Sequence, residues 1–452
     1  MSPPSSEPPA APSSRPPDGE HRRGGRPDYL HQPARRPFLI GVYLATNAIA
    51  DAATIVDGPD CAFFKTEFIH GKHDLNSTLL DVTGNHRILV SHVTTDDVAT
   101  SKGERAVELC RSAAQMPGIG LVMVTSLPMV AIIGIQYDQI IRQIEPELSA
   151  DLVEVPGRSL QGDWLDGYED VLKALARRVP ASPDDVAADS VSIIGYLMDR
   201  NEEDQRGNVR EFGRLVEGVG LRLDSVWLSG RPWAELRRAS CSGTLVALPM
   251  GREAARLIGE QTGAQVVELD VPFGAEHTVR FVRGLAAATG REQRAASFLR
   301  AELEDIAPRL EWAVPHLFLG KRVLFSGAPD LLPGFADMAC ELGMEVLELS
   351  SPARQPAWFE PASVRDLRPV FDVSLDAVGQ QALSSGGRPD LIIGSTEALQ
   401  AVPPYVPGVE LGFPSYSDHA FVDRPHLGFR GYLQFVQRMA TAMGLAAGRI
   451  RR

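Results

Sequence analysis

The chain of 452 residues is too long for one hydrophobic core, because single cores stop growing at roughly 250–300 residues. The formal net charge of −13 disfavours nucleic acid as a partner, since phosphate binding requires a basic surface. The chain has no apolar run long enough to span a bilayer and no signal-peptide segment at its start, so we expect a cytoplasmic protein with several domains.

Residues 1–36 are rich in Pro, Ser, Gly and Arg. Such a composition buries too little apolar surface to offset the entropy of the chain, which predicts a disordered tail. The arginines of this tail could contact a partner, but a solvated tail is the simpler interpretation.

From Pro37 onwards, short runs rich in Val, Ile and Leu alternate with helical patterns. Apolar runs of this kind are typical of strands that are buried on both faces. The predicted strands are residues 88–93, 120–125, 192–197, 243–248, 266–269, 322–326, 345–349, 390–394 and 409–413. The clearest helices are predicted at 104–114, 209–217, 252–262, 292–303 and 332–342.

Strand–helix–strand alternation predicts an α/β fold with parallel β-sheets flanked by helices. The pattern divides into three Rossmann-like lobes, at residues 37–185, 186–318 and 319–452. Because open parallel sheets bind ligands at the carboxyl ends of their strands, we expect a site in the cleft where the lobes meet.

An ordered series of short segments carries a family resemblance. The series contains Asp57-Gly58-Pro59-Asp60-Cys61, then Gly162 to Tyr168, Phe273-Gly274 with Thr278, Leu411 to Pro414 and Gly428 to Tyr432. In this order the segments resemble the nitrogenase component 1 family, over residues 37 to 445. That family includes molybdenum–iron protein subunits, cofactor-assembly scaffold subunits and subunits of the dark-operative protochlorophyllide and chlorophyllide reductases.

The resemblance implies a pair of homologous subunits with an iron–sulfur cluster at their interface. It also implies a separate ATP-dependent iron protein that supplies electrons, and a small-molecule substrate between the lobes. Tetrapyrrole-like or other unsaturated substrates are expected, because several relatives reduce conjugated rings.

Four cysteines occur in the chain, and none lies in a CxxC pair. Members of the resembled family commonly present three cysteines to the interface cluster, and here only Cys61 matches one of those positions. The other two positions fall near Arg36 and Leu127. The resemblance therefore makes Cys61 a metal ligand and Asp60 an additional oxygen ligand of a cluster that a partner subunit or a second copy must complete. The alternative is that Cys61 is a buried thiol that ends a strand.

Cys110 and Cys340 lie on predicted helices, and we expect both to pack in the core because cysteine is among the most buried residue types. By the resemblance, the cysteine that holds the cofactor in true nitrogenases would fall near Ala247, and the matching histidine near Gly412. Neither residue is present there. Reduction of dinitrogen at a large molybdenum cofactor is therefore not expected.

The loop after the Gly-Phe-Pro segment carries several polar side chains, and the resemblance places this loop near the inter-lobe cleft. Tyr416, Asp418 and His419 are the candidates for proton donation in a reduction, and a hydrogen-bonded surface loop is the alternative. Arg430 could hold an anionic substrate through its guanidinium, or could form a salt bridge instead.

His70 and His73 form a short polar cluster with a glycine inside it. A solvated helix end is the simpler interpretation of this cluster, and metal binding or proton transfer is the alternative.

The chain has neither a GxxxxGK[ST] loop nor a GxGxxG fingerprint, so we expect no nucleotide in it. Two functions remain from the sequence. The first is the catalytic-component subunit of a nitrogenase-like oxidoreductase, and the second is a cluster-free scaffold or binding protein with the same fold.

Overall fold

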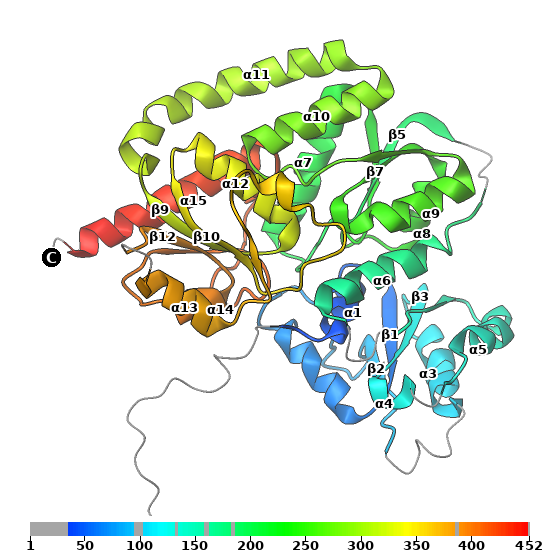
Figure 1. The fold of residues 1–452 in the computed structure, drawn as a ribbon. Coiled ribbons are helices and arrows are strands. Elements are labelled where there is room, and N and C mark those ends of the chain that lie inside the picture. The colour runs from blue at the N-terminus through cyan, green and yellow to red at the C-terminus, as the bar shows by residue number, and fades with distance from the viewer. Residues whose placement is uncertain are drawn as a thin grey trace, which may run out of the picture.

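The computed structural model describes residues 35–94, 103–131, 134–157, 162–181, 186–384 and 388–450. Within these ranges the chain forms three parallel β-sheets flanked by helices, which confirms the predicted α/β class (Figure 1). The predicted disordered tail lies almost entirely outside the described residues. No helix among them is long and apolar enough to cross a membrane.

The first sheet has the strand order β2-β1-β3-β4. Its strands are β1 (Ala52–Asp57), β2 (Ile88–Val90), β3 (Leu121–Ser126) and β4 (Asp151–Glu154). Its helices are α1 (Phe38–Asn47), the 3-10 helix η2 (Asp60–Phe68), α3 (Glu104–Ala114), α4 (Pro128–Ala131), α5 (Tyr137–Ile144) and α6 (Trp164–Ala176).

The second sheet has the order β6-β5-β7-β8. Its strands are β5 (Ala187–Ile194), β6 (Arg222–Val226), β7 (Ser242–Ala247) and β8 (Gln265–Glu268). The accompanying helices are α7 (Glu203–Val219), α8 (Trp233–Leu236), α9 (Arg252–Thr262), α10 (Ala275–Thr289) and α11 (Glu292–Glu311).

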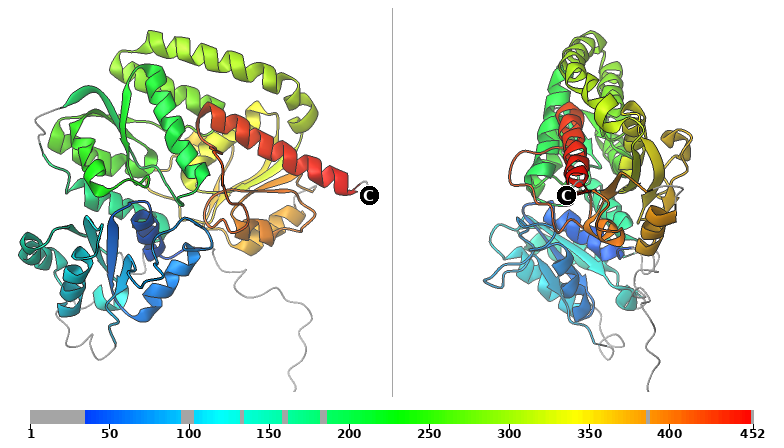
Figure 2. Two further views of the ribbon diagram at one scale, coloured as in Figure 1. Left: turned by 180° about the vertical axis from the view of Figure 1, so that it is seen from behind. Right: turned by 90° about the vertical axis from the view of Figure 1, so that its left-hand side faces the viewer.

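The third sheet has the order β11-β10-β9-β12-β13. Its strands are β9 (Arg322–Ser326), β10 (Glu345–Ser351), β11 (Val370–Phe371), β12 (Leu391–Gly394) and β13 (Gly408–Glu410). Helices α12 (Leu332–Glu341), α13 (Leu375–Ser384), α14 (Thr396–Ala401) and α15 (Gly428–Ile450) complete this part of the chain. The C-terminal helix α15 runs back across the molecule and packs beside α7, as Figure 2 shows from behind.

The four strands β1, β4, β6 and β11 were not predicted, and several predicted strands are too long. The predicted strand at 192–197 is wrong at its end, because β5 stops at Ile194 and Gly195 turns the chain with a φ of 99°. A positive φ of this kind suits glycine and interrupts a strand. The predicted strand at 409–413 ends early as well, before Gly412 with a φ of 89°.

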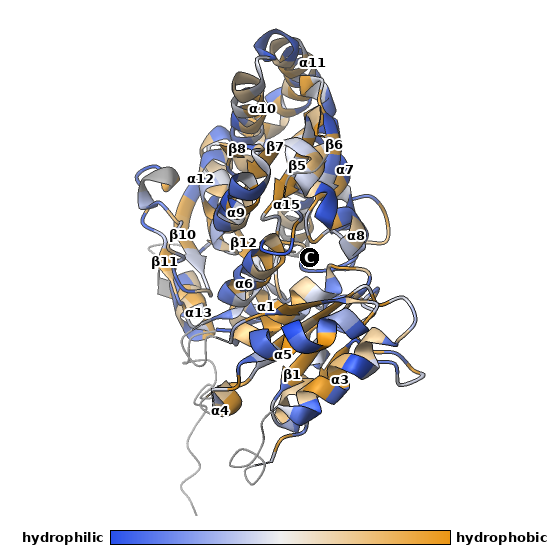
Figure 3. Ribbon diagram, turned by 90° about the vertical axis from the view of Figure 1, so that its right-hand side faces the viewer, coloured by the Kyte–Doolittle hydropathy of each residue, from blue (hydrophilic) through white to orange (hydrophobic). Residues whose placement is uncertain are grey.

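Two smaller hydrophobic clusters lie under α3 and α5 on the first sheet and under α13 on the third, and the other buried side chains of the three sheets share one large cluster. Phe38, Tyr168, Phe212, Phe335 and Phe435 all belong to this cluster, although they come from all three sheet regions. Figure 3 shows the matching pattern, with hydrophobic residues along strands such as β1 and mixed faces on helices such as α3 and α5. The exact lobe boundaries stay a prediction, but the lobes share their apolar interior.

Candidate functional site

A narrow cavity of about 50 Å³ lies where the carboxyl ends of strands from the second and third sheets meet. The segments after β5, β9, β10, β12 and β13 all line it, and Trp164 at the start of α6 closes one side. Parallel sheets commonly place ligand sites at these strand ends. A volume of this size holds on the order of three to five water molecules, since each needs about 10–15 Å³.

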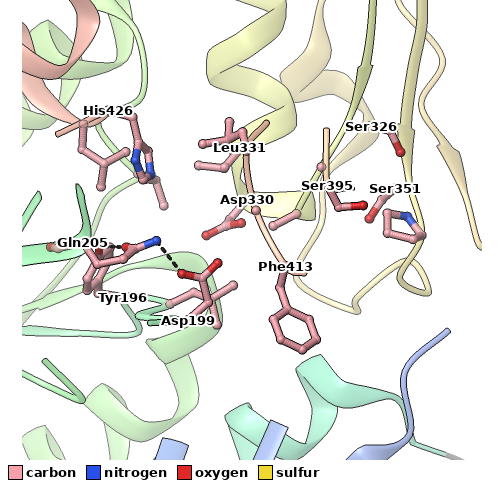
Figure 4. Close-up of a pocket in the computed structure, with 18 of the residues that line it drawn as sticks. Tyr196, Asp199, Gln205, Ser326, Asp330, Leu331, Ser351, Ser395, Phe413 and His426 are labelled. Carbon is pink, nitrogen blue, oxygen red and sulfur yellow. Dashed lines mark hydrogen bonds between the residues drawn. The ribbon is translucent and has the colours of Figure 1, made fainter. Parts of the chain in front are cut away.

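Two buried carboxyl groups, Asp199 and Asp330, line the cavity (Figure 4). Burial raises the pKa of Asp199 to about 7 and that of Asp330 to about 6. Desolvation disfavours the charged form, so both groups can hold a proton near neutral pH. Carboxyl groups poised in this range are suited to general acid–base work.

A chain of hydrogen bonds positions Asp199. Asn208 donates to the Tyr196 hydroxyl at 3.0 Å, and this hydroxyl donates to the Gln205 side-chain oxygen. The Gln205 amide then donates to Asp199 Oδ1 at 2.6 Å. The far end of this chain is His426, whose pKa is lowered to about 4 by burial and whose ring contacts Asn208. These contacts fix Asp199 on the α7 side of the cavity.

Asp330 is held differently. It lies in the short 3-10 turn η7 (Pro329–Leu331), directly after β9, and is 8% exposed. Its Oδ1 atom is buried without a hydrogen-bond partner in the structure. An unpartnered buried oxygen is costly, and such groups commonly act on a ligand, a water molecule or a proton.

The junction of the lobes is built from buried polar residues beside the cavity. His73 is fully buried, and its Nδ1 accepts a 2.8 Å hydrogen bond from the Ser415 backbone N–H. Its Nε2 lies 3.1 Å from the Asp199 carbonyl oxygen. The expectation that His73 lies at a solvated helix end is therefore wrong, because its ring joins segments of all three lobes. Burial lowers its pKa to about 3.

The predicted proton donors do not line this cavity. Asp418 is paired with Arg424 at 2.8 Å and Arg438 at 2.6 Å, and His419 Nδ1 contacts Glu202 at 2.8 Å. Burial raises the pKa of Tyr416, whose backbone N–H donates to Thr396 at 2.6 Å. The three side chains share a loop but are engaged in contacts between structural segments.

Arg430 is on α15, away from the cavity lining, with a side chain that is 68% exposed and 3.7 Å from Glu211. The geometry is that of an ion pair between α15 and α7, which joins two of the predicted lobes, whereas the alternative interpretation was a salt bridge inside one lobe. Its role in substrate binding stays a prediction.

Cys61 lies at the surface, in the first turn of η2. The alternative of a buried thiol is therefore wrong. Two contacts fix the turn before it, because the Ser91 hydroxyl donates to Asp57 at 2.6 Å and accepts from the Gly58 N–H at 2.9 Å. The Tyr43 hydroxyl donates to the Ala62 carbonyl at 3.0 Å and anchors the turn that follows.

Asp60, next to Cys61, is exposed and paired with His92. Across the described residues, no group of three or more His, Cys, Asp or Glu side chains is arranged to hold a metal ion. One exposed thiol with a neighbouring carboxylate does not by itself fit a cluster with four ligands.

The remaining cysteines divide between the core and the surface. Cys110 is buried, as predicted, whereas Cys340 is exposed. The prediction for Cys340 is wrong because the buried part of α12 ends at Ala339.

Asp199 and Asp330 were missed by the sequence analysis, although a signal was present. Asp330 directly follows the strand-to-helix turn after β9, and Asp199 follows β5 by a few residues. An acidic residue just beyond a buried parallel strand points to the sheet edge where ligands bind. The pairing of the two carboxyls in one cavity depends on how the second and third sheets meet, which no local pattern encodes.

The family model described as "Nitrogenase component 1 type Oxidoreductase" matches residues 38–444. The nitrogenase molybdenum–iron protein alpha chain of Methanococcus maripaludis is 22% identical over 403 residues, which cover 85% of this chain and 76% of that protein. The corresponding beta chain of Frankia alni is 26% identical over 317 residues, covering 62% and 58%.

The solved structure titled "Nitrogenase Cp1 at pH 6.5" matches with a TM-score of 0.78 and 15% sequence identity, and 96% of each chain is covered. At this identity the likeness shows the fold.

Proposed function

This chain belongs to the nitrogenase component 1 type oxidoreductase family, and we propose that it is the catalytic-component subunit of a two-component, nitrogenase-like reductase. A separate ATP-dependent iron protein would supply the electrons, because this chain has no phosphate-binding GxxxxGK[ST] loop of its own. The observation that carries the proposal is the exposed Cys61 at the carboxyl edge of the first sheet, in a chain that matches the family over residues 38–444.

The proposed partner is a homologous component 1 subunit or a second copy of this chain. Relatives of both the alpha and the beta type match this chain, which supports a partner of the same fold. Cys61 and Asp60 would contribute their thiolate and carboxylate to a shared iron–sulfur cluster, and the partner would contribute the remaining ligands. Such a cluster, when bound, supplies one-electron transfer.

The proposed substrate is a small unsaturated molecule. The narrow cavity of about 50 Å³ accommodates only a few non-hydrogen atoms, which favours such a molecule over a tetrapyrrole in this arrangement of the lobes. Reduction consumes protons as well as electrons, and Asp199 and Asp330 are placed to supply them to the cavity. Tyr416, Asp418, His419 and Arg430 remain candidates that would have to act from outside this lining.

A cluster-free scaffold or binding protein is the second candidate function. The specific observation in its favour is that Cys61 is the single thiolate at the expected cluster position, with no second cysteine near Arg36 or Leu127. In that case the cavity would bind a ligand without reducing it.

Anaerobic purification of the chain together with its partner subunit distinguishes the two functions. We expect iron, acid-labile sulfide and a brown absorbance in the complex, and we expect Cys61→Ala to remove most of all three. Cys340→Ala is the matched control, because Cys340 is also an exposed thiol but lies on α12. A complex without iron, or equal iron in Cys61→Ala and in the control, would contradict the reductase proposal and favour the cluster-free scaffold.

A further inference from the structure

A second hollow lies on the other side of Asp330. It is a groove of about 370 Å³ between the second and third sheets, formed by the end of β8, the start of α10 and the segment 358–360. Arg280, which lines the groove, has a side chain that is 51% exposed, so the groove reaches the surface. The narrow cavity and this groove are adjacent.

Asp330 lines both the groove and the cavity. Its neighbour Pro329 faces the groove, and Leu331 faces the cavity, so the η7 turn is the wall between them. The buried Oδ1 atom of Asp330 has no hydrogen-bond partner among the residues that the structure describes, so it can bind a proton or a water molecule. In the close-up of Figure 4, the Asp330 carboxyl points into the cavity, on the side where Asp199 lies.

We infer that Asp330 carries protons between the wider groove and the narrow cavity, and that Asp199 receives them inside. The Gln205 amide occupies Asp199 Oδ1, so Oδ2 is the atom that accepts the proton. In the transfer, the O–H bond of the Asp330 carboxyl breaks and an O–H bond forms on Asp199, directly or through the few waters that the cavity can hold. The Asp330 carboxylate then takes a proton from hydronium in the groove and leaves a water molecule there, and no electron moves.

The electrostatic surroundings suit this transfer. Burial raises the pKa of both carboxyls to between about 6 and 7, so the two proton affinities are similar. A proton can therefore move in either direction at little cost in free energy. The charged and titratable groups that line the two hollows with Asp330 are Tyr196, Asp199 and His426 in the cavity, and Arg252, Glu268, Asp270, His277, Arg280 and Glu360 in the groove. Asp199 also faces His73, whose Nε2 lies 3.8 Å from Asp199 Oδ2, and the charges of Arg200, Asp204 and Asp74.

The test measures the exchange of the Asp199 carboxyl proton with solvent, by infrared spectroscopy of the full chain after rapid mixing into D₂O. The band of the protonated Asp199 carboxyl is assigned by its loss in Asp199→Asn. We expect Asp330→Asn to slow its exchange by about 100-fold, the low end of what a positioned acid contributes. Asp330→Glu, which retains the carboxyl, should keep most of the rate, and Asp330→Ala provides the same test if the Asn variant does not fold.

Asp270→Asn is the matched control, because Asp270 lines the groove but not the cavity, and it should leave the rate unchanged. Equal rates in Asp330→Asn and the unaltered chain, or no Asp199-dependent band below pH 7, would overturn the inference. The biological use of the relay rests on the proposed reductase function, but the measurement needs no electrons, cluster or partner. The exchange rate therefore tests the proton relay alone, and the iron content of the complex tests the reductase proposal.

Discussion

At the residue scale, the candidate functional residues fall into an exposed pair and a buried group. Cys61 and Asp60 are exposed at the edge of the first sheet, whereas Asp199, Asp330 and His73 are buried where the lobes meet. Local motifs identified the first pair because the Gly-Pro turn and the cysteine are adjacent in sequence. They could not identify the second group, because its members come together only through tertiary packing.

His73 gives a prediction for the pH dependence of stability. Its pKa is about 3 in the folded chain and about 6.5 in an unfolded one, so the unfolded state binds a proton first as the pH falls. The stability that the neutral ring contributes is complete above pH 6.5 and is lost as the pH falls towards 3, by about 1.4 kcal/mol per pH unit.

His73→Gln removes this titration. The difference in unfolding free energy between the unaltered chain and this variant should shrink as the pH falls through that window, as measured by urea unfolding. His316→Gln provides the control, since it makes the same replacement at an exposed ring that is not packed between the lobes. A constant difference for His73→Gln across the window would show that the ring is not held neutral in the fold.

At the element scale, helices with clear periodicity were predicted best. The predicted helices at 104–114 and 252–262 coincide with α3 and α9, and the predicted strand at 322–326 coincides with β9. Short or edge strands such as β11 were missed, since two residues carry no periodicity. The central strand β1 was missed as well, because its end was interpreted as part of the cysteine loop.

The crossing of α1 and α6 depends on two glycines, Gly41 and Gly167. A Cβ atom at Gly167 would lie 2.1 Å from the Phe38 carbonyl oxygen, and one at Gly41 would lie 1.7 Å from the Trp164 carbonyl oxygen. These are backbone atoms that cannot move without separating the helices. The two helices touch only because neither residue has a side chain at the contact.

We therefore expect Gly167→Ala to lower the free energy of unfolding by about 1–3 kcal/mol or more, the usual cost of overpacking. Gly213→Ala is the matched control on α7, because a Cβ there would meet only a Leu223 methyl carbon at 3.8 Å. That variant should gain about 0.5–1 kcal/mol from helix propensity. Denaturant unfolding measures both, and equal effects of the two substitutions would contradict the close crossing.

At the scale of the whole molecule, the three sheets are joined by polar contacts as well as by a shared core. Buried Asp74 accepts hydrogen bonds from Asn47 at 2.7 Å and from the Asn201 backbone at 2.8 Å, and Glu202 accepts from Ala420 at 2.8 Å. The α/β class and the three-part pattern could be predicted from sequence, because strand and helix periodicities are local. The cavity could only be placed in general terms, at strand ends, because its shape depends on how the sheets meet.

The central claim at this scale is that the chain contributes one exposed thiolate to a site that a second subunit completes. Thiol labelling tests this claim most directly, by comparing the isolated chain with the anaerobically assembled complex. We predict that Cys61 and Cys340 both react in the isolated chain, since both are exposed, and that only Cys61 becomes protected on assembly. Equal labelling of Cys61 in the chain and in the complex would contradict the account.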